Sequence, residues 1–204
     1  MITPFIGFAG NIGSGKTTFT RFISKSQNWI PFYEPVSDNP YLEDFYNDMP
    51  RWSFNLQVYF LHKRFEMHKK MSQMKMGVVQ DRTIFEDKEI FAKNLYEMKK
   101  ISQRDWENYS GLFASMVSFL KKPDLVIYLK ASTDILLKRI QSRNRDFEKN
   151  VDPGYIRTLN VAYDRWVDKE KRYPVLIINT DNFNIYKDQH SFKKIEKKIL
   201  KKLF

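Results

Sequence analysis

The fold of this chain is decided by the stretch Gly10-Asn11-Ile12-Gly13-Ser14-Gly15-Lys16-Thr17-Thr18. It completes the pattern G-x-x-x-x-G-K-[ST]. The apolar run over residues 4–9 predicts a buried strand before it, and residues 16–26 predict a helix after it. The glycines let backbone N–H groups turn toward phosphate oxygens, and the helix N-terminus adds a partial positive charge. We therefore expect a loop that binds the phosphates of a nucleoside triphosphate.

Two side chains of this loop have chemistry of their own. Lys16 can reach the β- and γ-phosphates and is a candidate catalytic residue, and the hydroxyl of Thr17 can ligate Mg²⁺. All nine residues of the stretch are candidates for ATP binding. The alternative is a glycine-rich turn that carries Lys-Thr by chance.

Composition bounds the possibilities further. A chain of 204 residues can hold one α/β domain with a full core. No apolar stretch has the length of a membrane span, and the N-terminal residues lack the charged and long apolar segments of a signal peptide. We therefore expect a cytoplasmic protein without a membrane partner. The absence of cysteine excludes a disulfide framework and a cysteine-ligated metal.

The formal net charge of +11 suggests nucleic-acid binding at first sight. Six of the lysines lie between Lys193 and Lys202, with Ile195, Ile199 and Leu200 between them. That spacing predicts a terminal amphipathic helix whose polar face is solvated. We therefore expect no nucleic-acid partner, although a nucleic-acid-binding ATPase remains an alternative.

Short apolar runs alternate with helical patterns throughout the chain. The predicted strands are residues 3–9, 30–34, 77–81, 124–129 and 174–179, and the predicted later helices are 40–73, 84–99, 102–121, 132–143, 153–171 and 190–203. This alternation indicates an α/β fold, a five-stranded parallel sheet with helices on both faces, in a single domain over residues 1–204. Ligands bind such sheets at the carboxyl ends of the strands.

Charged residues follow several of these strand ends. Glu34 follows the second strand and could accept the proton of a hydroxyl that attacks a γ-phosphate. After the third strand, Asp81 could hold Mg²⁺, and Arg82 could orient Glu34 and neutralise phosphate charge. Asp181 follows the last strand and is a further candidate for ATP binding. Each residue taken alone could instead be a helix cap or part of a surface ion pair.

A possible base-binding pocket comes from two helices. Gln57 and Arg64 share the apolar face of the first helix, so they should point inward and need polar partners. On the next helix Asp87 and Phe91 offer an acid and a ring. An amide, an Arg–Asp pair and an aromatic wall suit a flat heterocycle. The alternative is a structural salt bridge with core aromatics.

An arginine-rich segment follows the fourth strand. Arg139, Arg143 and Arg145 end a predicted helix and lead into a polar loop. Guanidinium groups there could close over a triphosphate and stabilise the transferred phosphoryl group. Cations at a helix C-terminus are also ordinary partners of the helix dipole.

With these residues in place, the chain resembles the deoxynucleoside kinase family from residue 5 to about 183. The resemblance rests on Gly-Asn-Ile-Gly-Ser-Gly-Lys-Thr at 10–17, Glu34-Pro35-Val36, Tyr46…Arg51-Trp52-Ser53-Phe54…Gln57…Arg64, Asp81-Arg82-Thr83…Asp87…Phe91, and Arg139…Arg143-Asn144-Arg145…Glu148. It implies a P-loop kinase that uses ATP and Mg²⁺ to phosphorylate the 5′-hydroxyl of a deoxynucleoside. It also implies a homodimer that packs the helices near 40–73 and 102–121, and feedback inhibition by a deoxynucleoside triphosphate.

The resemblance also implies roles for individual residues. Glu34 would be the base for the 5′-hydroxyl, supported by Arg82, and Tyr46 and Glu148 would bind the sugar 3′-hydroxyl. The base would be read by Gln57, Arg64 and Asp87, with Phe91 stacked on it. Arg139, Arg143 and Arg145 would be the arginines of a lid at about 143–152.

The base preference follows from the charged pair. Family members that prefer thymidine usually carry apolar residues at these positions, and this chain looks like a bacterial, mycoplasma-type member that phosphorylates deoxyadenosine. An ionised Asp87 held by Arg64 only accepts hydrogen bonds, which disfavours the carbonyl of thymine. Deoxyguanosine or deoxycytidine as the main substrate stays an alternative, because Phe60 is bulkier than usual and Ser37-Asp38-Asn39-Pro40 lacks the tryptophan of animal members. A nucleoside-monophosphate kinase would need basic residues near Glu34, and Ser37-Asp38-Asn39 provides none.

Overall fold

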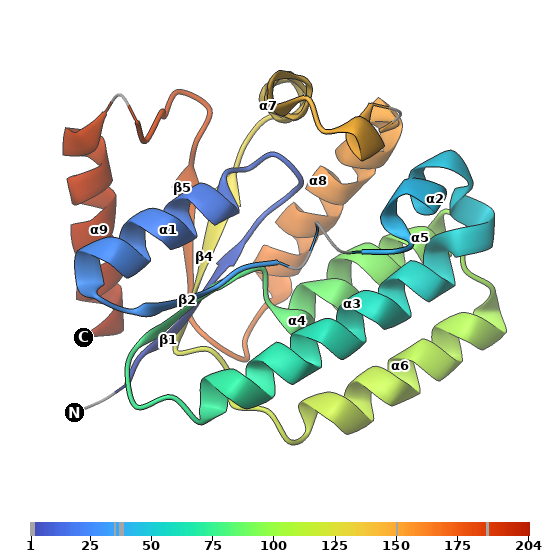
Figure 1. Cartoon of the computed structure of the whole chain (residues 1–204), viewed down its shortest axis with the longest axis horizontal. Coiled ribbons are helices and arrows are strands. Elements are labelled where there is room, and N and C mark those ends of the chain that lie inside the picture. Colours follow the sequence, from blue (N-terminus) through green and yellow to red (C-terminus); the bar gives the residue numbers. More distant parts are fainter. Residues whose placement is uncertain (1–2, 35, 37–38, 150, 187) are drawn as a thin grey trace.

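The computed structural model describes residues 3–34, 36, 39–149, 151–186 and 188–204. Its elements, shown in Figure 1, are β1 Phe5–Ala9, α1 Lys16–Gln27, β2 Ile30–Phe32, α2 Leu42–Asn47, α3 Met49–Ser72, β3 Val78–Asp81, α4 Ile84–Glu86, the π-helical η1 Asp87–Ala92, α5 Lys93–Glu97, α6 Gln103–Val117, β4 Leu125–Lys130, α7 Thr133–Arg143, the short 3₁₀ helix η2 Asp146–Glu148, α8 Pro153–Lys169, β5 Val175–Asn179 and α9 Gln189–Leu203. The five predicted strands are confirmed, with ends within two residues of those expected.

The strands form one parallel sheet in the order β2-β3-β1-β4-β5. In its register, Phe8 of β1 lies beside Asp81 of β3 and Ile127 of β4. The predicted five-stranded parallel sheet is therefore confirmed. Because β1 is central, the loop that follows it lies between the ends of β3 and β4, where ligands bind such folds.

Helices cover both faces of this sheet, as predicted. On one face α1 and α9 pack through Phe19, Ile23, Phe192 and Ile199, all buried against the strands (Figure 1). The polar face of α9 carries the lysines, which confirms the expected amphipathic helix.

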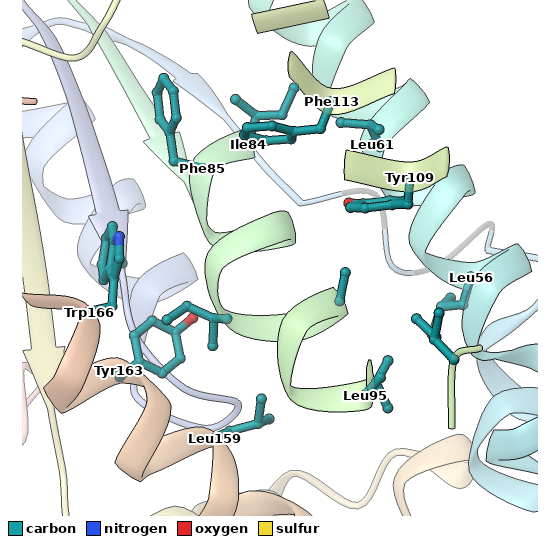
Figure 2. Close-up of a cluster of buried hydrophobic side chains, with 14 of the residues drawn as sticks. Leu56, Leu61, Ile84, Phe85, Leu95, Tyr109, Phe113, Leu159, Tyr163 and Trp166 are labelled. Atoms are coloured by element: carbon teal, nitrogen blue, oxygen red, sulfur yellow. The ribbon is translucent and has the colours of Figure 1, made fainter. Parts of the chain in front are cut away.

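The opposite face holds the larger core. Buried residues of α3, α4, α6 and α8 meet there, and Figure 2 shows Tyr163 and Trp166 of α8 across this cluster from Leu56 and Tyr109. In the described part of the chain, no helix is both long enough and apolar enough to cross a membrane.

Two predicted helices differ from those found. The helix expected over 40–73 is broken at Asp48, whose side chain accepts a 3.2 Å hydrogen bond from the Arg51 N–H and caps α3. Pro50 lies in the first turn of α3, where its missing N–H leaves no hydrogen bond unmade. The helix expected over 84–99 contains the π-helical segment η1, and the one expected over 102–121 ends at Val117.

Candidate active site

The phosphate-binding loop has the backbone that its glycines predicted. Gly10, Gly13 and Gly15 adopt φ angles of 147°, 84° and 98°. A Cβ on Gly10 would lie 2.6 Å from Ser14 Oγ and 2.8 Å from the Leu129 carbonyl oxygen, so a side chain does not fit there. The loop is a cradle that phosphate oxygens can enter.

Lys16 lies inside this cradle. Its buried ammonium donates hydrogen bonds of 3.0 Å to the carbonyl oxygens of Gly10 and Asn11. Burial, with a smaller contribution from the positive charge of Arg82, lowers the pKa of Lys16 to about 8. Phosphate oxygens would be stronger partners for this ammonium than the two carbonyls.

Helix α8 holds the loop from its other side. Asn11 Nδ2 donates to the Ile156 carbonyl and to Asn160 Oδ1, both at 2.9 Å. Asn160 in turn donates to the Ala131 carbonyl after β4. The loop is therefore fixed to the helix that follows the predicted lid.

A cavity of about 730 Å³ opens beside the loop. The predicted residues that line it are Ile12, Gly13, Ser14, Gly15, Lys16, Thr17, Thr18, Glu34, Tyr46, Gln57, Asp81, Arg82, Phe91, Arg139, Arg143, Arg145 and Glu148. Gly10, Asn11, Arg64, Asp87 and Asp181 are not among the described residues that line it. The cavity thus joins the phosphate loop to most of the predicted nucleoside site.

The residues predicted to hold Mg²⁺ lie together. Thr17 Oγ1 donates a 2.5 Å hydrogen bond to Asp81 Oδ2, and the other oxygen, Oδ1, is buried with no partner among the described residues. Those residues contain no cluster of three His, Cys, Asp or Glu side chains that could hold a metal. A hydroxyl and a carboxylate fit Mg²⁺ that takes its remaining ligands from phosphates and water.

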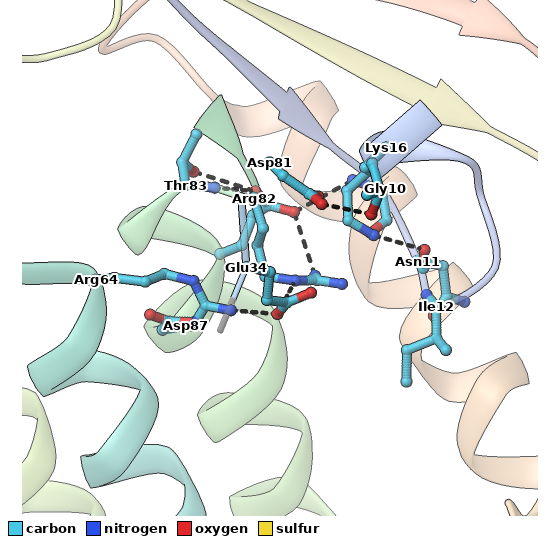
Figure 3. Close-up of polar contacts among 12 residues, drawn as sticks. Gly10, Asn11, Ile12, Lys16, Glu34, Arg64, Asp81, Arg82, Thr83 and Asp87 are labelled. Atoms are coloured by element: carbon cyan, nitrogen blue, oxygen red, sulfur yellow. Dashed lines mark hydrogen bonds and ion pairs between the residues drawn. The ribbon is translucent and has the colours of Figure 1, made fainter. Parts of the chain in front are cut away.

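Glu34 lies between two buried guanidinium groups. Its Oε1 accepts a 2.9 Å hydrogen bond from Arg82 Nε and a second, charge-assisted bond from Arg64 Nη2, as Figure 3 shows. Burial alone would raise the pKa of Glu34, but Arg82 and Arg64 together lower it to about 2. Glu34 is thus ionised at neutral pH, as a proton acceptor must be. Pro35, next in the predicted motif, lies outside the described residues, as do Ser37 and Asp38.

Arg64 bridges Glu34 to Asp87. Its Nη1 donates to Asp87 Oδ1, and both side chains are almost completely buried (Figure 3). Burial raises the pKa of Asp87 to about 7, although Arg64 opposes this shift. The expectation of an ionised Asp87 stays a prediction, because burial opposes ionisation of this carboxyl while the Arg64 guanidinium favours it.

The predicted base pocket has Gln57 and Phe91 on its wall and the charged pair behind it. Gln57 is 2 % exposed, and its Oε1 has no hydrogen-bond partner among the described residues, so it is available to a ligand. The Phe60 ring covers Arg64, with the guanidinium carbon 4.7 Å from its centroid. A base would reach Asp87 only after a side chain of the wall moves.

The predicted sugar-binding residues come from two segments in contact, α2 and η2. Tyr46 of α2 lies near Glu148, whose charge adds to burial in raising the pKa of the Tyr46 phenol. Glu148 is occupied by the lid arginines: Arg143 Nε donates to its Oε2 at 2.5 Å, and Arg145 Nη1 lies 3.7 Å from its Oε1. The connection between α7 and α8 is the predicted lid; its residue Asn150 lies outside the described residues.

Two predicted phosphate-binding residues have other partners. Arg139 lies inside α7 rather than in the lid, and its guanidinium donates to the Thr180 carbonyl at 2.5 Å and to Thr180 Oγ1 at 3.2 Å. Asp181 Oδ1 accepts a 2.7 Å hydrogen bond from the Ser132 N–H. The prediction that Asp181 contacts ATP is not supported by this geometry, because its carboxylate caps the turn before α7.

Sequence reasoning missed two residues beside Arg82. Glu86 is fully buried and is hydrogen-bonded to Thr83, to Gly10 and to the phenol of Tyr163. The Thr83-x-x-Glu86 spacing is that of a capping box and could have indicated Glu86. Nothing in the sequence around Tyr163 indicates its contact with Arg82, which spans 81 positions.

Comparison with known proteins identifies the family of this chain. The sequence model of "dNK: Deoxynucleoside kinase" matches residues 6–204. The deoxyadenosine/deoxycytidine kinase of Bacillus subtilis is 36% identical, over 93% of this chain and 88% of that protein. The deoxyadenosine kinase of Dictyostelium discoideum is 41% identical, over 87% of this chain and 73% of that protein. A structure of deoxyadenosine kinase from M. mycoides with bound dATP matches with a TM-score of 0.83 at 30% identity, over 94% of this chain and 98% of that one.

Proposed function

Because the chain belongs to the deoxynucleoside kinase family, we propose that it transfers the γ-phosphoryl group of ATP to the 5′-hydroxyl of deoxyadenosine. One observation carries this proposal. The carboxylate of Glu34, held by Arg82, borders the same cavity as the phosphate loop. A hydroxyl placed between them could attack the terminal phosphate while Glu34 receives its proton.

Glu34 and Arg82 act on the acceptor side of this reaction. The ionised carboxylate orients the 5′-hydroxyl and takes its proton as the bond to phosphorus forms. Arg82 keeps the carboxylate in place through its Nε and brings positive charge close to the transferred group. Donor and acceptor are thereby held in line, which is most of what phosphoryl transfer requires.

Lys16 and the loop amides act on the donor side. The ammonium would leave the Gly10 and Asn11 carbonyls for the β- and γ-phosphates, and Arg143 and Arg145 would approach the triphosphate as the lid closes. Bound Mg²⁺, held by Thr17 and Asp81, would neutralise charge on the phosphates.

The choice of deoxyadenosine rests on Gln57 and on the relatives. The amide of Gln57 offers a donor and an acceptor side by side, which can pair with the 6-amino group and a ring nitrogen of adenine. Both relatives described above by sequence identity are named for deoxyadenosine, and the one from Bacillus subtilis is also named for deoxycytidine. Deoxycytidine and deoxyguanosine are weaker substrates in this proposal, and thymidine is poor.

We extend the proposal to assembly. A homodimer would form through α3 and α6, as the family resemblance implies. The apolar side chains of Leu112 on α6 and Phe119 just after it are 43% and 84% exposed, which supports an interface on this side.

We also infer feedback inhibition by a deoxynucleoside triphosphate. The M. mycoides relative was solved with bound dATP, the triphosphate of its nucleoside. A cavity that joins the phosphate loop to the nucleoside pocket could hold such a molecule with its phosphates toward Lys16.

The test is a substrate panel with ATP and Mg²⁺. The four deoxynucleosides and their ribose counterparts are each assayed for 5′-phosphorylation. We expect the highest kcat/KM for deoxyadenosine and the lowest among the deoxynucleosides for thymidine. Phosphorylation of nucleoside monophosphates alone would contradict the proposed reaction, and thymidine as the best substrate would contradict the proposed pocket.

A further inference from the structure

Arg82 has an unusual backbone and a guanidinium with two sets of partners. Its φ angle of 68° is left-handed, which is uncommon for a residue with a side chain. The N–H of Arg82 donates a 2.9 Å hydrogen bond to the Phe8 carbonyl of β1, which helps to hold this conformation. The guanidinium of Arg82 contacts Glu34 through its Nε and Tyr163 through its Nη1.

Tyr163 fixes the second side of that guanidinium. Arg82 Nη1 donates to the phenolic oxygen at 2.6 Å, and the phenol gives its own proton to Glu86 Oε2, also at 2.6 Å. A hydroxyl has one proton to donate, so with Glu86 as its acceptor the Tyr163 oxygen can only accept from Arg82. The direction of both hydrogen bonds is therefore determined.

Glu86 does more than cap a short helix. Its Oε1 accepts from the Thr83 N–H at 2.7 Å, which completes the capping box. Its Oε2 faces the Tyr163 phenol, Arg82 Nη1 at 3.5 Å and the N–H of Gly10 at 3.2 Å. One carboxylate oxygen thus joins the catalytic arginine to the first amide of the phosphate loop.

In the part of the chain that the structure describes, neither Glu86 nor Tyr163 lines the cavity. Glu86 is fully buried and Tyr163 is as well, so neither contacts a substrate in this structure. Their effect on the reaction has to pass through Arg82 and the loop.

We propose that Glu86 and Tyr163 are positioning residues for phosphoryl transfer: together they hold the Arg82 guanidinium so that its Nε meets Glu34, and Glu86 ties that guanidinium to the Gly10 amide at the start of the phosphate loop. The inference rests on the proposed function, in which Glu34 is the proton acceptor. The pair sets the distance between the proton acceptor and the phosphate cradle, two parts of the site that come from different strands.

Tyr163→Phe tests the inference, because it removes one hydroxyl and leaves the ring. The ring of Tyr163 stacks on that of Tyr128, with centroids 5.5 Å apart and planes 10° from parallel. Tyr128→Phe is the matched control, since it removes the hydroxyl of the neighbouring ring, which bonds only to Asp164 among the described residues. We expect Tyr163→Phe to lower kcat about 10-fold or more with the dissociation constant for deoxyadenosine changed less than about threefold, and Tyr128→Phe to leave both unchanged.

A double-mutant cycle with Glu34→Gln separates positioning from structural damage. Glu34→Gln alone should lower kcat by about 10²–10⁴-fold. If Tyr163 acts through Arg82 on Glu34, adding Tyr163→Phe to that variant should lower kcat by less than about twofold further. An equal loss in both backgrounds, or a Tyr163→Phe enzyme within twofold of wild type, overturns the inference.

Glu86→Gln provides the second variant. Its amide can still accept from Thr83, but an NH₂ group in place of Oε2 faces the Gly10 and Arg82 donors. We expect a loss of kcat at least as large as in Tyr163→Phe with the circular dichroism spectrum unchanged; a variant that folds with full kcat refutes the role of Glu86. Wild-type turnover in Glu34→Gln would instead contradict the proposed function, whatever the Tyr163 and Glu86 results.

Discussion

Removing the Arg64–Asp87 pair should cost less stability than the sum of the two single removals, because neither buried group is then left without its partner. Arg64 and Asp87 are each 1% exposed, and Arg64 is hydrogen-bonded to both Asp87 and Glu34. Arg64→Met leaves a buried carboxyl without its partner, which typically costs about 3–5 kcal/mol. Because the pKa of Asp87 is already about 7, its carboxyl can become protonated at little cost in free energy. We therefore expect a loss of stability at the lower end of this range, about 3 kcal/mol.

The other single variant leaves half of a network. In Asp87→Ala the guanidinium of Arg64 keeps Glu34 but loses a charged acceptor, which should cost about 2 kcal/mol. The double variant removes both charges, and Glu34 retains Arg82, so its stability should lie within about 1–2 kcal/mol of wild type. The single losses add to about 5 kcal/mol, and a coupling of about 3 kcal/mol follows.

Urea denaturation at pH 7 measures these stabilities, and initial rates measure base choice. In the double variant the ratio of kcat/KM for thymidine to that for deoxyadenosine should rise at least about 10-fold, equivalent to about 1.4 kcal/mol, because a polar network that disfavours a carbonyl is gone. The exposed pair Lys93–Glu97, with 52% and 51% exposure, is the control, and its double variant should show coupling below about 0.5 kcal/mol. Additive losses for Arg64 and Asp87, or a folded double variant without any gain on thymidine, would refute the reasoning.

Two further predictions concern the sugar and the pH. A 3′-deoxy analogue of deoxyadenosine should have a lower kcat/KM than deoxyadenosine, by a factor that corresponds to about 1–3 kcal/mol of transition-state stabilisation. Tyr46→Phe and Glu148→Gln should each discriminate less strongly than wild type against this analogue. Equal discrimination in all three enzymes would remove both residues from the sugar site. Burial raises the pKa of Asp87 from 3.8 to about 7, so the folded protein binds this proton more tightly than the unfolded chain, and stability is lost as the pH rises from about 4 to about 7. The Asn side chain of Asp87→Asn does not titrate, so the unfolding free energy of this variant relative to wild type should increase by on the order of 4 kcal/mol between about pH 4 and about pH 7. A difference that is constant with pH would show that the pKa of Asp87 is not shifted in the folded protein.

The positions of the strands along the chain and the phosphate loop could be predicted because their signals are local. Gly10, Gly13 and Gly15 carry the loop by themselves, and a short apolar run before them suffices for β1. The carboxyl ends of parallel strands meet at one edge, so Glu34 and Asp81 could be expected near the loop without any knowledge of packing.

The breaks within helices were harder to predict because each depends on competition between neighbouring signals. Asp48 and Pro50 form a helix start inside a run whose apolar spacing continues on both sides. The π-helical segment Asp87–Ala92 adds a residue to one turn and so changes which side chains share a face. Phe91 belongs to this segment, and its ring lies over the guanidinium of Arg82, 4.3 Å from ring centroid to Cζ. Sequence periodicity assumes a regular helix and cannot locate such a turn.

The contacts between distant parts of the chain could not be predicted because they are set by how elements pack. Arg64 pairs with Glu34 as well as with Asp87, a contact across 30 positions that depends on where α3 crosses the end of β2. This shared guanidinium has a chemical consequence. Arg64 lowers the pKa of Glu34 and opposes the raised pKa of Asp87 at the same time, so any ligand that draws Arg64 toward the base pocket weakens its hold on the proton acceptor. Base recognition and proton transfer therefore cannot be separate properties of this site, and substitutions in the base pocket should change kcat as well as KM.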